Sequence, residues 1–176
     1  MGFSGWAFKE VLQMKSKPDR GSHLPVLMKL ISITSGPILE LGCGMYSTTY
    51  LHWACYPTKR RLVTCESKPE WIGFAKQFEA DFHEIRFVPD WNLLDLSEQY
   101  TIAFVDHAPD ERRIDDILRL THVDYVVAHD AENRREHKYN YRRARAVFKF
   151  RTTYADARPN TAIFSNKHDL RGFTIP

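Results

Sequence analysis

Glycine and hydroxyl residues that could bind a ligand follow a short apolar stretch near the start of the chain. Gly42 and Gly44 let the backbone approach a ligand closely, while Ser47 and Thr48 begin an expected helix whose first amides would attract an anion. The loop lacks the Lys-Ser/Thr pair of a P-loop, and Ser47 stands where a dinucleotide loop has its third glycine. The pattern therefore predicts a nucleotide-like ligand, with a tight strand-to-helix turn as the alternative.

Acidic side chains follow the next two expected strands. Glu66 comes about 20 residues after the glycine loop, where an acid can accept hydrogen bonds from ribose hydroxyls. Asp90 could hold an adenine amino group, and Trp91 beside it could cover the ring. Each residue alone has a plain alternative, since Glu66 would serve equally as a solvated helix cap. The combination predicts a nucleoside site at the carboxyl ends of the strands.

The ends of the fourth and fifth expected strands carry groups suited to catalysis, namely Asp106, His107 and Asp130. An unperturbed histidine titrates near about 6.5, so His107 is a candidate general base, and His129 is a second candidate. Either histidine could instead only pack or cap. Hard divalent ions prefer carboxylate oxygens, so Asp106, Asp130 and Glu132 are candidate Mg²⁺ ligands.

Apolar stretches of strand type alternate with stretches of helical period. Strands are expected at 37–41, 62–65, 85–88, 101–105 and 125–128, with a closing hairpin of 148–154 and 161–165. Such alternation predicts an α/β fold with a mostly parallel sheet and helices on both faces. The segments between these strands supply the helices, and 134–147 is expected to be helical.

Two helices are expected ahead of the first strand. The first is indicated by apolar residues three or four apart: Phe3, Ala7, Val11 and Met14. The second would have Ser22 as its N-cap, and His23 at its start could reach a cofactor carboxylate, although a solvated position is the simpler interpretation. Residues 1–35, with Phe3 and Trp6, would then form a lid over the core.

Composition limits the class of protein. The chain has 176 residues, 43% of them hydrophobic, which fits one globular domain. No apolar run is long enough to cross a membrane, and no signal peptide is recognisable at the N-terminus. The three cysteines form no metal-binding pattern, so we expect a reduced, cytoplasmic protein.

Positive charge is concentrated in one segment. The net charge is +3, and residues 133–151 hold eight Lys or Arg against one Glu, which leaves 17 basic and 21 acidic residues elsewhere. Arginines interleaved with Tyr139 and Tyr141 could bind nucleic acid. A solvated face, or a contact between subunits of a homodimer, is the favoured interpretation.

With these motifs in place, the stretch from Glu40 to Gly44 resembles motif I of the class I S-adenosylmethionine-dependent methyltransferases. The resemblance covers about residues 20–165. It implies a Rossmann-like three-layer sandwich with a mostly parallel seven-stranded sheet, an antiparallel C-terminal strand and a cofactor-binding core at 36–165. It also implies that S-adenosylmethionine is bound by Glu40, Gly42, Gly44, Ser47, Thr48, Glu66, Asp90 and Trp91.

The stretch after the fourth strand is similar to that of small O-methyltransferase-like families. The resemblance implies O-methylation of a small-molecule or sugar-like hydroxyl, with Asp106, His107 and Asp130 as catalytic residues, and Mg²⁺ in some members. Glu111 and Arg112 could contact the acceptor. The alternatives are a nucleic-acid-directed methyltransferase, a non-catalytic nucleic-acid-binding protein that uses 133–151, and an NAD-binding domain, which the incomplete glycine pattern disfavours.

Overall fold

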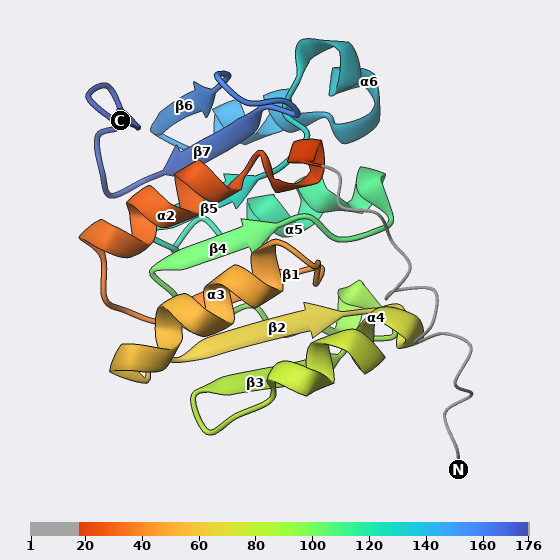
Figure 1. Cartoon of the computed structure of the whole chain (residues 1–176). Coiled ribbons are helices and arrows are strands. Elements are labelled where there is room, and N and C mark those ends of the chain that lie inside the picture. The colour runs from red at the N-terminus through yellow and green to blue at the C-terminus, as the bar shows by residue number, and fades with distance from the viewer. Residues whose placement is uncertain (1–17, 176) are drawn as a thin grey trace.

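The computed structural model describes residues 18–175, whose strands form a seven-stranded sheet in the order β3-β2-β1-β4-β5-β7-β6 (Figure 1). Strands β1 to β5 are parallel, and β7 is antiparallel to both of its neighbours, β5 and β6. This arrangement confirms the predicted fold class. The strands are β1 (Ile38–Leu41), β2 (Leu62–Glu66), β3 (His83–Phe87), β4 (Ile102–Val105), β5 (Tyr125–Ala128), β6 (Phe150–Tyr154) and β7 (Thr161–Ser165).

Helices cover both faces of the sheet. On the face toward the viewer in Figure 1 lie α2 (Leu24–Ile33), α3 (Ser47–Cys55) and α4 (Pro69–Ala75). On the opposite face, α5 (Arg113–Arg119) and the 3-10 helix η7 (Tyr141–Ala146) pack against the other side of the same strands. Among the described residues, no helix is long and apolar enough to cross a membrane.

The remaining helical elements are short connections between strands and longer helices. They are η1 (Pro18–Gly21), η2 (Tyr56–Thr58), η3 (Lys76–Phe78), η4 (Trp91–Leu93), η5 (Asp110–Arg112), η6 (Asn133–Arg135) and α6 (Glu136–Tyr139).

The core has two layers, one on each side of the sheet. Strands β1, β2, β4 and β5 are buried along their whole length, as expected of parallel strands covered on both faces. Alternate side chains of each strand point to opposite layers. In β4, for example, Phe104 faces α2 and α3, whereas Ala103 and Val105 face α5.

The basic segment is not the continuous helix that its sequence predicts. Asn140 adopts a left-handed conformation with φ 51° and separates α6 from η7. In an unbroken helix, residues two apart do not face the same side. The break lets both Tyr139 and Tyr141 turn inward, where their rings stack with centroids 5.3 Å apart. Val147, near the end of this segment, is 41% exposed.

The start of α2 also differs from the prediction. The N-cap position is occupied by His23, and Ser22 makes no capping bond. The Ser22 hydroxyl instead forms hydrogen bonds with two residues distant in sequence, His129 and Pro159. The first expected helix, with Phe3 and Trp6 of the proposed lid, lies outside the described residues. The described part of that lid includes α2, which packs into the core through Val26, Leu27 and Leu30.

Candidate functional site

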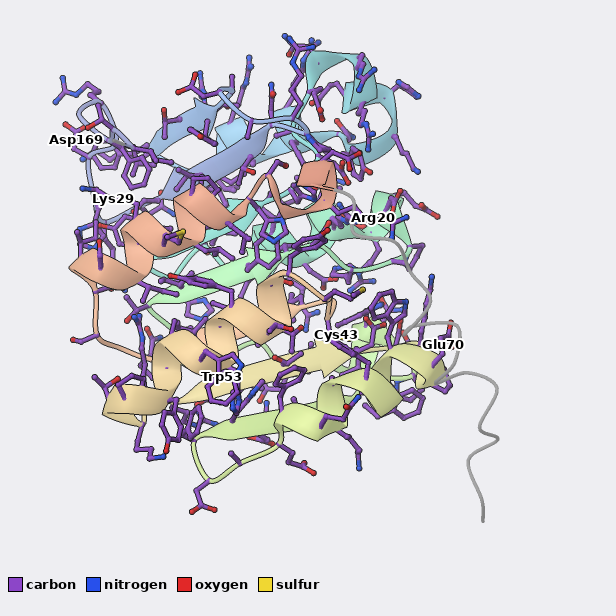
Figure 2. The ribbon with its side chains drawn as sticks, viewed as in Figure 1. Arg20, Lys29, Cys43, Trp53, Glu70 and Asp169 are labelled. Carbon is purple, nitrogen blue, oxygen red and sulfur yellow. The ribbon has the colours of Figure 1, made fainter. Side chains whose placement is uncertain are left out.

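A cavity of about 380 Å³ opens at the carboxyl ends of β1, β4 and β5, where the order of the strands reverses. Open parallel sheets bind ligands at this edge, and ligand sites commonly measure about 300–1,000 Å³. Arg20 and Cys43, labelled in Figure 2, both lie at this end of the sheet. The lining residues are Asp19, Arg20, His23, Cys43, Gly44, Met45, Tyr46, Ser47, Trp71, Asp106, Arg113, His129, Asp130, Arg135 and Pro159.

The glycine loop forms one wall of this cavity. Gly42 has φ +90°, and a Cβ there would lie 2.5 Å from the backbone N and Cα of His107, so only glycine fits. A Cβ on Gly44 would meet only Ser47 Oγ, at 3.4 Å. Both Gly44 and Ser47 line the cavity, and α3 begins at Ser47. The N-terminus of α3 therefore offers its amides to an anionic group.

Glu40 and Thr48 lie beneath the loop and do not line the cavity. The Glu40 carboxylate is fully buried, and its Oε2 accepts hydrogen bonds from Thr48 (2.9 Å) and Thr64 (2.7 Å). Thr48 Oγ1 in turn accepts from the Gly44 amide at 2.9 Å. Burial raises the pKa of Glu40 to about 7, against the opposing effect of its hydroxyl partners. The contact of these two residues is with the loop, and a contact with a cofactor stays a prediction.

Glu66 also holds the loop in place. Its carboxylate accepts the backbone amides of Cys43 (3.1 Å), Ser67 (2.7 Å) and Lys68 (2.8 Å). Glu66 is not the solvated helix cap considered for it, because Lys68 occupies the N-cap position of α4 and the Glu66 side chain is buried. Its binding to a ribose stays a prediction, because the carboxylate lies behind the lining residues.

Asp90 and Trp91 are turned away from the cavity. Asp90 is exposed and accepts the Asn92 amide at 2.9 Å, which caps η4. Trp91 is buried, donates its indole N–H to Ala108 O at 2.8 Å and stacks on His107. The prediction that Trp91 covers an adenine ring is therefore wrong in geometry. The tryptophan that lines the cavity is Trp71, in α4.

His107 occupies the opposite side of the sheet. Its side chain is fully buried, its ring stacks on Trp91 with centroids 4.3 Å apart, and Nε2 lies 3.1 Å from Asp116 Oδ2 in α5. This placement contradicts the assignment of His107 as general base, because no acceptor in the cavity could reach the ring. Alternation along β4 is the physical reason: Asp106 follows the parity of Phe104, and His107 that of Val105.

The two aspartates after β4 and β5 both line the cavity, and an arginine joins them. Arg113 Nη1 lies 2.9 Å from Asp106 Oδ1 and 3.1 Å from Asp130 Oδ2. Burial would raise the pKa of Asp106, but the charges of Arg113 and His129 outweigh it and lower that pKa to about 2. Sequence reasoning missed Arg113 and chose Arg112, which pairs with Asp116 outside the cavity; Glu111 is exposed.

This pairing argues against the expected Mg²⁺ site. The cation between Asp106 and Asp130 is a guanidinium, and Asp130 also binds Arg135 Nη1 at 2.6 Å and the Tyr139 hydroxyl at 2.9 Å. Glu132 is buried beside Arg135, with 3.9 Å between Oε2 and Nε. Asp106, Asp130 and Glu132 do not converge on one point within residues 18–175, where the group suited to a metal is a different one.

Two histidines complete the far wall of the cavity. His129 Nδ1 lies 3.3 Å from Asp106 Oδ2, and its Nε2 lies 2.9 Å from the Ser22 hydroxyl. Burial lowers the pKa of His129, but the hydrogen bond and charge of Asp106 outweigh this and raise it. His23 stands edge-on to His129, and burial together with His129 lowers the pKa of His23 to about 3.

Several basic side chains of the segment 133–151 form ion pairs with acidic residues of the same chain. Arg135 pairs with Asp130, Lys138 with Asp110, and Arg143 with Asp115. Three other arginines, Arg142, Arg145 and Arg151, line a separate hollow of about 190 Å³ beside β6 and β7.

We compared the chain with protein-family models, with curated proteins and with solved structures. No protein-family model matches the chain, and no curated protein matches it at a significant level. Solved structures do match. Cofactor-bound Rv0187 from MTB has a TM-score of 0.62 and 19% identity, with 92% of this chain and 90% of that one covered.

Two further matches have similar scores. A protein described as an O-methyltransferase, from Klebsiella pneumoniae, has a TM-score of 0.63 and 16% identity over 96% of this chain and 92% of its own. The methyltransferase PaMTH1 from Podospora anserina, bound to SAH, has a TM-score of 0.63 and 14% identity over 93% of this chain and 85% of its own. The chain therefore has the fold of the class I methyltransferases, as the resemblance in its sequence predicted.

Proposed function

We propose that this protein transfers a methyl group from S-adenosylmethionine to a hydroxyl oxygen of a small molecule. The observation that supports this best is the cavity at the strand-order reversal. Its one wall is the Gly44–Ser47 turn, and its other wall is the Asp106–His129 pair. The fold around it is shared with cofactor-bound Rv0187 and with the SAH-bound methyltransferase PaMTH1.

The residues of the cavity fit the cofactor. Its carboxylate suits the amides at the start of α3 and the Arg20 guanidinium, both of which line the space. Its ammonium group suits the carboxylate of Asp19 or Asp106. The Trp71 ring supplies a flat apolar surface for the adenine. When bound, S-adenosylmethionine would supply a methyl group on a positively charged sulfur.

The acceptor is expected on the side of Asp106 and His129. A hydroxyl must lose its proton when it accepts a methyl group, and a positioned base or cation promotes that loss. Arg113 holds Asp106 through Oδ1, and Ser22 holds His129 through Nε2, so both side chains are fixed before an acceptor arrives. The pair takes the place that the sequence had suggested for Asp106 and His107.

Nucleic acid is the weaker candidate for the acceptor. Enzymes of this fold that methylate amino groups of bases resemble one another in an Asp/Asn-Pro-Pro-aromatic stretch after the fourth strand, whereas this chain has Asp106-His-Ala-Pro109-Asp110. The hollow lined by Arg142, Arg145 and Arg151 is the observation that favours nucleic acid. Binding of RNA that weakens steeply with salt, and is lost on replacing these arginines, would support it.

The first test of the proposal is calorimetric titration of the protein with S-adenosylmethionine and S-adenosylhomocysteine, with NADH for comparison. Gly44→Ala adds a methyl group to the cavity wall, at a position where the protein itself leaves space for it. The variant should bind both sulfur nucleotides at least about tenfold more weakly than wild type does. Gly73→Ala, in α4 with open space around it, is the matched control and should bind them unchanged. Folded protein that binds neither nucleotide would refute the cofactor assignment.

The second test separates binding from transfer. Once an acceptor is found, His129→Gln should keep cofactor binding within about twofold and slow transfer by about 10²–10⁴-fold. His107→Gln, which changes a ring on the other side of the sheet, should leave the transfer rate of the folded protein nearly unchanged. Equal losses in both variants would show that the histidines act through stability alone.

A further inference from the structure

We propose that His23, Asp106 and His129 bind a divalent transition-metal ion, with Zn²⁺ as the best fit, at the wall of the cavity. Each residue offers one ligand atom, and these atoms lie within 4.8 Å of one another. The three residues come from the start of α2 and from the ends of β4 and β5, and all three line the cavity. This inference goes beyond the proposed methyl transfer and does not depend on it.

Hydrogen bonds around His129 determine which of its ring nitrogens can bind a metal. The Ser22 hydroxyl has one hydrogen, and it donates that hydrogen to the Pro159 carbonyl at 2.6 Å. Ser22 Oγ must therefore accept from His129 Nε2, at 2.9 Å, so Nε2 carries a proton. In the neutral ring, Nδ1 then presents a lone pair toward the Asp106 carboxylate, 3.3 Å away.

Two lone pairs so close repel each other unless a positive species lies between them. That species is either a second proton on His129 or a metal ion. A metal-ligating histidine usually donates its other N–H to a fixed oxygen, which sets the tautomer and the ring orientation. The Pro159–Ser22–His129 chain is an arrangement of this kind, and it is built from segments more than a hundred residues apart in sequence.

His23 provides the independent observation. Its side chain is 2% exposed, and neither ring nitrogen has a hydrogen-bond partner among residues 18–175. A buried polar group without a partner is destabilising, so such a group in a folded protein calls for an explanation. The centre of the His23 ring lies 4.6 Å from that of the Phe104 ring and 4.8 Å from that of the His129 ring. Both nitrogens of this ring are therefore available to a ligand, and a neutral imidazole is the form that binds metals.

Asp106 divides its two oxygens between two partners. Oδ1 is 2.9 Å from Arg113, and Oδ2 faces His129. The Arg113 charge is shared further with Asp110 and Asp130, so Oδ2 remains an anionic ligand.

The chemistry of the set selects the ion. Two imidazoles and one carboxylate suit Zn²⁺ or another first-row transition metal, whereas Mg²⁺ prefers oxygen ligands alone. With bonds of about 2.0–2.2 Å, tetrahedral Zn²⁺ keeps its ligand atoms about 3.4 Å apart. The His129–Asp106 separation of 3.3 Å already matches this distance, and His23 would have to move inward by a small side-chain rotation. A three-ligand site leaves a coordination position open to an oxygen of the acceptor.

The test measures metal binding by tag-free protein without cofactor. Wild-type protein, dialysed against Zn²⁺ and separately against Co²⁺, should bind one equivalent of metal, and Co²⁺ should give the visible absorption of a low-symmetry site. His23→Gln and His129→Gln should each weaken binding at least about 100-fold, and Ser22→Ala about 10–100-fold. His137→Gln, which removes an exposed histidine elsewhere, is the matched control and should bind as wild type does.

Two outcomes would overturn the inference. One is wild-type protein that binds neither metal, or binds it no more tightly than His23→Gln does; His129 would then simply carry the second proton. The other is an intense sulfur-to-cobalt band that disappears in Cys43→Ser, which would place the ion on the cavity cysteine. Circular dichroism confirms that each variant is folded. Titration with S-adenosylhomocysteine keeps the two proposals separate, since either ligand can bind without the other.

Discussion

Replacement of Gly42 by alanine should destabilise the protein strongly, because two independent effects act at this position. Alanine at φ +90° costs about 1–2 kcal/mol relative to an ordinary conformation. The new Cβ would also lie 2.5 Å from the backbone N and Cα of His107, and backbone cannot rotate aside as a side chain does. Separating β1 from the segment after β4 by roughly 1 Å adds an overpacking cost of about 1–3 kcal/mol.

The sum is a loss of about 2–5 kcal/mol in the free energy of unfolding. For a chain of this length, 1 kcal/mol changes Tm by about 2–4 °C, so Tm should fall by about 4–20 °C. Thermal unfolding followed by circular dichroism measures this directly. Gly73→Ala is the matched control: it lies in α4 with no atom near its Cβ, and alanine should stabilise that helix by up to about 1 kcal/mol.

A Tm for Gly42→Ala within about 2 °C of wild type would refute this reasoning. It would mean that the loop can move without loss of packing. The close approach of β1 to the segment after β4 would then not be what fixes the cavity wall.

Three further predictions concern charge and backbone conformation. Arg113→Met leaves three carboxylates without their shared partner and should cost about 3–5 kcal/mol in urea unfolding, whereas Arg143→Met, at an exposed pair, should cost under about 1 kcal/mol. The pKa of Glu40 is raised from 4.5 to about 7 by burial, so its contribution to stability is complete below about 4.5 and is lost as pH rises to about 7. The Tm difference between Glu40→Gln and wild type should shift in favour of the variant over that interval and then stay level. At the left-handed Asn140, Gly should be tolerated and Val should lower Tm by several degrees, as differential scanning fluorimetry would show.

The fold could be predicted from sequence because its signals are local and repeated. Continuous apolar stretches marked the strands that are covered on both faces, and helical spacing marked the segments between them. The basic segment was wrongly predicted as one continuous helix because that prediction also used a local signal alone. Helical period alone did not show that Tyr139 and Tyr141 both turn inward, which requires a left-handed residue between them.

The glycine loop was located correctly, but the role of its acids was not visible in the sequence. Glu40 and Glu66 bind the loop from beneath, through Thr48 and through backbone amides. The longer of these contacts join residues 8 and 23 positions apart, and the spacing of residue types does not specify them. Arg113 was missed for the same reason, because its three acidic partners come from the ends of two strands and from η5.

The choice between the two candidate histidines, in contrast, could have been made from sequence. Side chains of a strand alternate between its faces, and the alternation continues for a residue or two beyond its last hydrogen bond. Counting from Phe104 gives Asp106 on the face of α2 and α3, and counting from Val127 gives His129 on that same face. The same count sends His107 to the face of α5, where it meets Asp116. Parity thus selects the pair whose atoms the structure brings to within 3.3 Å, and it makes His129 the histidine whose replacement should impair the chemistry of the cavity.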